Sequence, residues 1–180
     1  MSHIQSEVSV SQRAKAIKMV LLDVDGVLTD GTIYYSDKGE SLKPFNTLDG
    51  QGLKYLLDEG IVVAIISGRA SESLRARAKD LGIQELHMNV SNKRTQAQEI
   101  LLRHELDWPQ VAAMGDDWPD LPILTQAGLS SAPLTAHPEL QRRVHWVTQA
   151  RGGQGAVREL CDLILKSQDR YEDLLNGYLT

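Results

Sequence analysis

The amino-acid sequence predicts an α/β fold, a three-layer α/β/α domain whose doubly wound sheet is mostly parallel, with an inserted β-hairpin and no cap domain. Three continuous apolar runs, at residues 19–22, 61–66 and 111–114, have the length and the share of β-branched residues that buried strands have. Between these runs, leucines recur at the spacing of a helix, as they do from residue 49 to residue 59. Strands that alternate with helices along a chain are typical of a parallel sheet covered on both faces.

The 180 residues are expected to form a single domain. Within it, residues 1–16 are expected as an N-terminal extension, residues 31–45 as the hairpin and residues 166–180 as a C-terminal tail. The formal net charge of −5 favours neither nucleic acid nor a membrane surface as a partner. Cys161 is the only cysteine, which excludes an intrachain disulfide, and no apolar run is long enough to span a bilayer. These features favour a cytoplasmic protein.

The helices of the first half of the chain have local signals at their ends. A short helix is expected at residues 9–16, before the first strand, and Gly60 is expected to end the helix at residues 49–59. Ser71 is a typical N-cap for the following helix, and Gly82 marks the end of that helix.

The second half of the chain repeats the alternation. A weak strand is expected at residues 85–88, and Asn92 opens the helix that follows it. After the strand at 111–114, a helix is expected to run to Ala127, with prolines near its first turn. The remaining expected elements are strands at 129–132 and 144–147, a glycine loop at 152–155 and a helix at 156–165.

The expected hairpin concentrates aromatic residues in a chain that has few of them. Tyr34, Tyr35 and Phe45, which is the only phenylalanine, all lie within residues 31–45. These side chains could pack on their own sheet or form a contact with another molecule, and the sequence favours both interpretations equally.

Acidic residues directly follow the first predicted strand. Asp23 and Asp25 stand two residues apart, so both point to the same side of an extended chain. Two neighbouring carboxylates repel each other unless a cation or a shared proton relieves the repulsion. Such a pair suits a site that binds Mg²⁺ and transfers a phosphoryl group to an aspartate. A surface turn, which Asp-Gly sequences often form, is the alternative for this motif taken alone.

Three further strand ends carry residues that suit the same chemistry. In open α/β sheets, ligands bind just beyond the carboxyl ends of the strands, where a hydroxyl and an ammonium can bind phosphoryl oxygens and carboxylates can hold a hard cation. The candidate residues at these three ends are Ser67, Lys93, Asp116 and Asp117.

On these residues the sequence resembles the haloacid dehalogenase-like superfamily of aspartyl-phosphate hydrolases. The matching motifs are D-x-D-G-V-L-T-D at residues 23–30, S-G-R at 67–69, Lys93, and G-D-D at 115–117, and the resemblance covers residues 17–165. The segment before Lys93 departs from the glycine-containing run expected there.

The resemblance implies a role for each residue. Asp23 is the nucleophile, and Asp25 is the general acid and later the base. Ser67 and Lys93 bind the phosphoryl group together with Gly68. The resemblance further implies that Asp23, the backbone carbonyl of Asp25, and Asp116 hold Mg²⁺, and that Asp117 supports the site through water or by orienting Lys93.

Arg69 is a candidate for binding a carboxylate of the substrate. It follows Ser67 by two residues at the strand end, and the planar guanidinium suits a carboxylate. A salt bridge at the start of the next helix is the equally weighted alternative.

The motifs and the lack of a lid insertion resemble the capless, tetrameric branch of the superfamily. This branch implies a Mg²⁺-dependent phosphatase for a phosphorylated sugar acid, in particular the eight-carbon one of lipopolysaccharide biosynthesis, acting as a homotetramer with active sites at subunit interfaces. A phosphatase for the nine-carbon N-acylneuraminate 9-phosphate, a phosphomutase and a noncatalytic subunit on the same fold are the alternatives.

Overall fold

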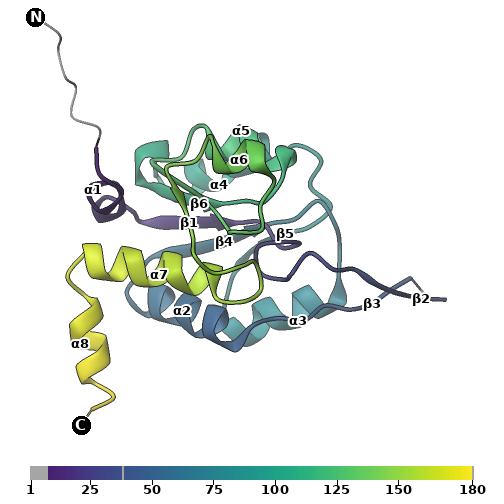
Figure 1. Ribbon diagram of the computed structural model, residues 1–180, viewed down its shortest axis with the longest axis horizontal. Helices are drawn as coiled ribbons and strands as arrows, with labels where there is room; N and C mark the ends of the chain where they lie inside the picture. The colour runs from purple at the N-terminus through teal and green to yellow at the C-terminus, as the bar shows by residue number, and fades with distance from the viewer. Residues whose placement is uncertain (1–7, 38, 180) are drawn as a thin grey trace, which may run out of the picture.

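The predicted fold class is confirmed by a computed structural model, which describes residues 8–37 and 39–179. The first seven residues of the expected N-terminal extension lie outside this range. A sheet of six strands, all parallel, forms the middle layer (Figure 1). In sheet order, its strands are β5 (Glu85–His87), β4 (Val62–Ile66), β1 (Met19–Leu22), β6 (Val111–Met114), β7 (Leu129–Ala132) and β8 (Trp146–Val147).

Helices cover both faces of this sheet. In Figure 1, α2, α3 and α7 lie below the sheet, whereas α4, α5 and α6 lie above it. The helices are α1 (Val10–Lys15), α2 (Thr47–Asp58), α3 (Glu72–Leu81), α4 (Lys93–Arg103), α5 (Leu121–Leu124), α6 (Pro138–Gln141), α7 (Ala156–Ser167) and α8 (Tyr171–Asn176), with 3₁₀ turns η1 (Trp108–Gln110) and η2 (Trp118–Asp120). Within the described residues, no helix combines the length and the apolar character that crossing a bilayer requires.

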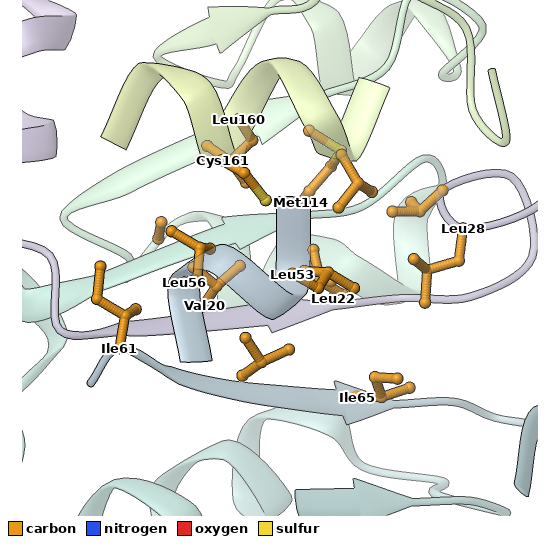
Figure 2. Close-up of a cluster of buried hydrophobic side chains, with 14 of the residues drawn as sticks. Val20, Leu22, Leu28, Leu53, Leu56, Ile61, Ile65, Met114, Leu160 and Cys161 are labelled. Atoms are coloured by element: carbon orange, nitrogen blue, oxygen red, sulfur yellow. The ribbon is translucent and has the colours of Figure 1, made fainter. Parts of the chain in front are cut away.

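The apolar strands alternate between two hydrophobic cores, as strands covered on both faces should. In β1, Val20 and Leu22 face the core between the sheet and helices α2 and α7, which Figure 2 shows. Met19 and Leu21 face the core between the sheet and α4. All four side chains are buried, and each contributes roughly 1.5–3 kcal/mol through burial. β1 is therefore held rigidly at the centre of the sheet, and the residues that follow it have a fixed starting point.

A buried carboxylate joins the first turns of two helices, α2 and α7. Asp49 in α2 accepts hydrogen bonds from the backbone N–H groups of Gly155, at 3.3 Å, and Arg158, at 2.8 Å. These donors belong to the first turn of α7, whose N-cap Gly155 has no side chain of its own to bind them. The motif around Asp49 and the glycine loop at 152–155 thus stabilise each other.

The helix expected to run from the G-D-D motif to Ala127 is much shorter than predicted. The structure has the 3₁₀ turn η2 followed by the single turn of α5. Pro119 and Pro122 lack the N–H group that a continuous helix needs, which explains the interruption. The strand expected at 144–147 is also shorter, because only Trp146 and Val147 pair with β7.

The expected C-terminal tail is partly helical and packs against its own chain. α7 extends to Ser167, and α8 follows it. The ring of Tyr178 lies edge-on to Tyr55 of α2, with ring centroids 6.1 Å apart.

The expected hairpin is present as the antiparallel pair β2 (Tyr34–Ser36) and β3 (Gly39–Leu42). It extends away from the body of the domain, at the right of Figure 1. Phe45, at its base, packs against the core, whereas the side chains of Tyr34, Tyr35 and Leu42 are 42%, 67% and 57% exposed. Phe45 thus packs on the domain itself, whereas Tyr34 and Tyr35 are left exposed in the single chain.

Candidate active site

The site lies where the winding of the sheet reverses. β1 stands between β4 and β6, with Leu22 aligned to Ile65 on one side and Met114 on the other. The chain proceeds from β1 to β4 and β5 in one direction and from β6 to β7 and β8 in the other, so the loops after β1 and β6 separate and leave a crevice. Asp23 and Asp116 follow these two strands.

Lys93 links two carboxylates at this crevice. As the first residue of α4, it is positioned by the N-cap Asn92, whose side chain accepts a hydrogen bond from the backbone N–H of Thr95. The Nζ of Lys93 donates to Asp23 Oδ1 at 2.7 Å and to Asp120 Oδ1 at 2.6 Å. Burial alone would lower the pKa of this lysine, but the charges of Asp120 and Asp23 raise it. Lys93 is therefore a fixed positive charge beside Asp23.

Three carboxylates form a pocket suited to a hard cation. Ligand oxygens of Asp23, Asp116 and Asp120 all lie within 4.8 Å of one another. Gly26 leaves this space free, since a Cβ at its position would lie 2.0 Å from Asp116 Oδ2. Three oxygen donors on rigid elements fit Mg²⁺, which prefers carboxylate ligands and keeps several waters.

Burial and mutual repulsion raise the pKa values of two of these carboxylates. Burial and the charge of Asp120, partly opposed by Lys93, raise the pKa of Asp23 to about 6. Burial and the charges of Asp23 and Asp120 raise the pKa of Asp116 to about 7. A divalent cation would relieve this repulsion by binding the ionised carboxylates.

We expect Mg²⁺ to stabilise the protein more at pH 8 than at pH 5.5. Because the folded pKa values of Asp23 and Asp116 are raised, the stability of the metal-free protein falls as the pH rises from about 4 to about 7. Below about pH 7, protons compete with the metal and weaken its apparent affinity by up to about tenfold per pH unit for each titrating ligand. Thermal unfolding with and without Mg²⁺ at both pH values measures the difference.

The matched control for that measurement is Asp80→Asn, which removes an exposed carboxylate from α3. It should keep the pH-dependent effect of Mg²⁺, whereas Asp116→Asn should greatly reduce it. An equal rise in Tm at both pH values would contradict the assignment of these carboxylates to the metal.

Asp25 belongs to a separate ion-pair network that joins the site to the hairpin. Lys43 Nζ makes a short contact with Asp25 Oδ1 and lies 3.3 Å from Glu40 Oε1. Arg69 Nη2 lies 3.1 Å from Glu40 Oε2 and 3.0 Å from the Tyr35 hydroxyl. Arg69 Nε is 3.8 Å from Asp25 Oδ2. The side-chain hydrogen bonds of Arg69 thus go to the hairpin, and its longer ion pair goes to Asp25. The alternative interpretation from the sequence was a salt bridge at the start of the next helix.

The structure places Ser67, Gly68 and Asp117 at strand ends as well, with different exposure. Ser67 is buried at the end of β4, and its hydroxyl accepts a hydrogen bond from the backbone N–H of Arg69 at 3.1 Å. A Cβ on Gly68 would have only one neighbour, the carbonyl of Val90 at 3.8 Å, so the backbone there is accessible. Asp117 is exposed, and its backbone N–H donates to Asp120 at 3.4 Å.

Sequence reasoning missed Asp120, Lys43 and Glu40. The geometry gives Asp120, rather than Asp117, the position that orients Lys93. An acid four residues after Asp116 was the available signal, since a turn returns its carboxylate to the backbone N–H of Asp116, at 3.1 Å. Lys43 and Glu40 had no comparable signal, because Lys43 contacts a residue 18 positions away in the sequence and Glu40 contacts one 29 positions away.

In the loop before Lys93, which lacks the expected glycine, an asparagine adopts a conformation typical of glycine. Asn89 has a φ of +57°, in the left-handed region that glycine adopts most easily and asparagine tolerates better than most other residues.

A substrate larger than phosphate must lie above these strand ends. The cavity lined by Asp23, Lys93 and Asp120 has a volume of about 10 Å³, which is room for about one water molecule. Small-molecule sites usually enclose most of their ligand. Among the described residues, this cavity therefore offers little enclosure for the rest of a substrate.

Comparisons with known proteins agree with this fold and site. The family described as haloacid dehalogenase-like hydrolase matches residues 85–160. The chain is 47% identical over 163 residues to the 3-deoxy-D-manno-octulosonate 8-phosphate phosphatase of Yersinia pestis, an alignment that covers 91% of this chain and 87% of that protein.

Solved structures show the same similarity. A phosphatase of that name from Moraxella catarrhalis, in complex with magnesium, phosphate and KDO, superposes with a TM-score of 0.91 at 36% identity, covering 94% of this chain and 97% of that one. The cobalt-bound enzyme from Haemophilus influenzae superposes with a TM-score of 0.90 at 39% identity, covering 94% and 100%. The chain therefore belongs to the haloacid dehalogenase-like hydrolases and, within them, to the family of 3-deoxy-D-manno-octulosonate 8-phosphate phosphatases.

Proposed function

We propose that this protein is a Mg²⁺-dependent phosphatase that hydrolyses 3-deoxy-D-manno-octulosonate 8-phosphate to the free sugar acid and phosphate, in lipopolysaccharide biosynthesis. The observation that carries the proposal is the contact of Lys93 with Asp23 beside the carboxylates of Asp116 and Asp120. This arrangement brings together a nucleophile, a fixed cation for phosphoryl oxygens and a metal pocket. The identity to the Yersinia pestis enzyme supports the choice of substrate.

The first half-reaction transfers the phosphoryl group to the protein. A carboxylate oxygen of Asp23 attacks phosphorus, the bond from phosphorus to the sugar oxygen breaks, and Asp25 gives its proton to that oxygen. The products are the free sugar acid and an acyl phosphate on Asp23. Lys93 stabilises the negative charge on the phosphoryl oxygens throughout.

The second half-reaction releases phosphate. Asp25, now a carboxylate, takes a proton from water as the water oxygen attacks phosphorus, and the bond from phosphorus to Asp23 breaks. Mg²⁺ bound by Asp23, Asp116 and Asp120, together with the backbone carbonyl of Asp25, would supply positive charge that lets an anionic nucleophile approach an anionic ester.

Ser67 and the backbone of Gly68 bind phosphoryl oxygens in this proposal, and Arg69 binds the carboxylate of the sugar acid. We expect Arg69→Lys to raise KM for the sugar-acid phosphate by about tenfold, because a lysine loses the bidentate geometry. KM for p-nitrophenyl phosphate, which has no carboxylate, should change little. Steady-state kinetics with both substrates measures the difference, and equal effects would assign Arg69 to phosphate or to structure.

The proposed active form is a homotetramer in which hairpins of neighbouring subunits enclose each site. A two-stranded hairpin is marginally stable alone, and the exposed Tyr34, Tyr35 and Leu42 offer it an apolar contact surface. We expect the double variant Tyr34→Asp, Tyr35→Asp to dissociate the oligomer and lose most sugar-phosphate activity, because charges at a buried contact are costly. Sedimentation velocity alongside phosphate release tests this.

Leu102→Asp is the matched control, because Leu102 is an apolar residue of α4 that is 82% exposed and outside the hairpin. It should leave assembly and activity unchanged. A wild-type monomer with full activity would contradict the shared site.

A substrate panel tests the proposed function. Phosphate release should show kcat/KM for 3-deoxy-D-manno-octulosonate 8-phosphate at least about tenfold above that for N-acetylneuraminate 9-phosphate, since one well-placed contact contributes about 1.4 kcal/mol. Preference for the nine-carbon substrate, or absence of phosphate release with Mg²⁺ present, would overturn the assignment. We place the reaction in the cytoplasm, which the single, buried cysteine supports.

A further inference from the structure

Lys43 is a buried cation in the active-site region that none of the roles above uses. It follows β3, at the base of the hairpin, and its side chain is only 3% exposed. A buried ammonium loses its hydration and is retained only when carboxylates compensate for that loss. Lys43 has two such partners, Asp25 and Glu40.

The contact with Asp25 distinguishes the two oxygens of that carboxyl group. Oδ1 accepts the hydrogen bond from Lys43. Oδ2 has Arg69 Nε at 3.8 Å, beyond hydrogen-bond distance. One oxygen of the proposed general acid is therefore fixed, and the other is available to a substrate or a water molecule.

Glu40 holds Lys43 and Arg69 beside Asp25. Its carboxylate lies 3.3 Å from Lys43 Nζ and 3.1 Å from Arg69 Nη2. Asp25 therefore has a cation beside each carboxyl oxygen, Lys43 at Oδ1 and Arg69 at Oδ2. Lys93 has a different task, because its partners are Asp23 and Asp120.

We propose that Lys43 is the positioning residue of the general acid: it fixes Asp25 through Oδ1, so that Oδ2 exchanges the proton with the leaving oxygen and then with water. Lys43 itself keeps its protons and touches no reacting atom. Without this contact, the Asp25 side chain could rotate to other staggered conformers, and a displacement of about 1 Å can cost about 100-fold in rate. The inference rests on the proposed phosphatase activity. It adds that a residue at the base of the hairpin fixes the orientation of the general acid.

The dependence on the leaving group tests the inference. Phenyl phosphate needs protonation of its leaving oxygen more than p-nitrophenyl phosphate does, because p-nitrophenolate is the more stable anion. With Mg²⁺ present, Lys43→Met should lower kcat/KM for phenyl phosphate by about 30-fold and for p-nitrophenyl phosphate by about threefold. These losses are smaller than the roughly 10²- to 10⁴-fold that a general acid supplies, because Asp25 itself remains. Lys43→Arg, which keeps a charged donor, should restore most of the loss.

A double-mutant cycle separates positioning from a general structural effect. In the Asp25→Asn background, Lys43→Met should change kcat/KM for phenyl phosphate by less than about twofold, because the group through which Lys43 acts is already gone. Equal losses on the two aryl phosphates, or the full loss again in that background, would overturn the proposal.

Lys54→Met, at an exposed position of α2, is the matched control and should behave as wild type. Should Lys43→Met lower Tm by more than about 10 °C, the same comparisons with Lys43→Gln decide the question. Aryl phosphates carry no sugar, so the sugar-acid panel can fail while this test succeeds, and the reverse also holds.

Discussion

Replacing Asp23 with asparagine should lower phosphate release by about 10³-fold or more while the fold is retained, because an amide cannot form the acyl phosphate. Lys93 would lose one carboxylate partner but keep Asp120, at 2.6 Å. Covalent phosphate on the acid-quenched protein should disappear together with turnover. Steady-state phosphate release and phosphoenzyme trapping measure the two effects.

Asp80→Asn serves as the control for this variant, because it makes the same chemical change at an exposed position of α3. Circular dichroism and thermal unfolding would establish that both variants fold. An Asp23→Asn protein that keeps more than a tenth of wild-type activity would show the nucleophile assignment to be wrong.

Asp25→Asn should slow both formation and breakdown of the phosphoenzyme, each by about 10²- to 10⁴-fold, because one carboxyl group serves both half-reactions. Single-turnover rapid quench with the sugar-acid phosphate resolves the two steps. Breakdown at the wild-type rate would mean that another group activates water.

The elements of the fold were predictable where local chemistry decides them. The runs at 19–22 and 111–114 are apolar throughout because both faces of these strands are covered, and both strands occur within the predicted limits. The prediction of one helix reaching Ala127 was wrong, because Pro119 and Pro122 were accepted as residues of its first turn although each lacks the N–H donor that a continuous helix needs.

The site was predictable only in part, because local sequence patterns locate some of its residues and contacts between distant residues locate the others. Asp23, Asp25 and Lys93 could be named because each follows or begins an element that the pattern of apolar residues locates. Asp120 and Lys43 act through contacts made across the fold, 27 residues from Lys93 and 18 from Asp25. No local pattern indicates which acid or which lysine makes such a contact, so these contacts could be found only from the three-dimensional structure.

The close contact between two glycine loops limits how this site could be redesigned. A Cβ on Gly152 would lie 1.8 Å from the carbonyl oxygen of Gly26, and a Cβ on Gly26 would overlap Asp116. A mutant library directed at these loops would therefore yield mostly unfolded or inactive proteins. The hairpin has no such steric limit at Tyr34 and Leu42, which are exposed in the single chain and limited only by the proposed contact with a neighbouring subunit. Laboratory evolution toward other phosphate esters should find its beneficial substitutions there, while the groups that break and form bonds to phosphorus stay untouched.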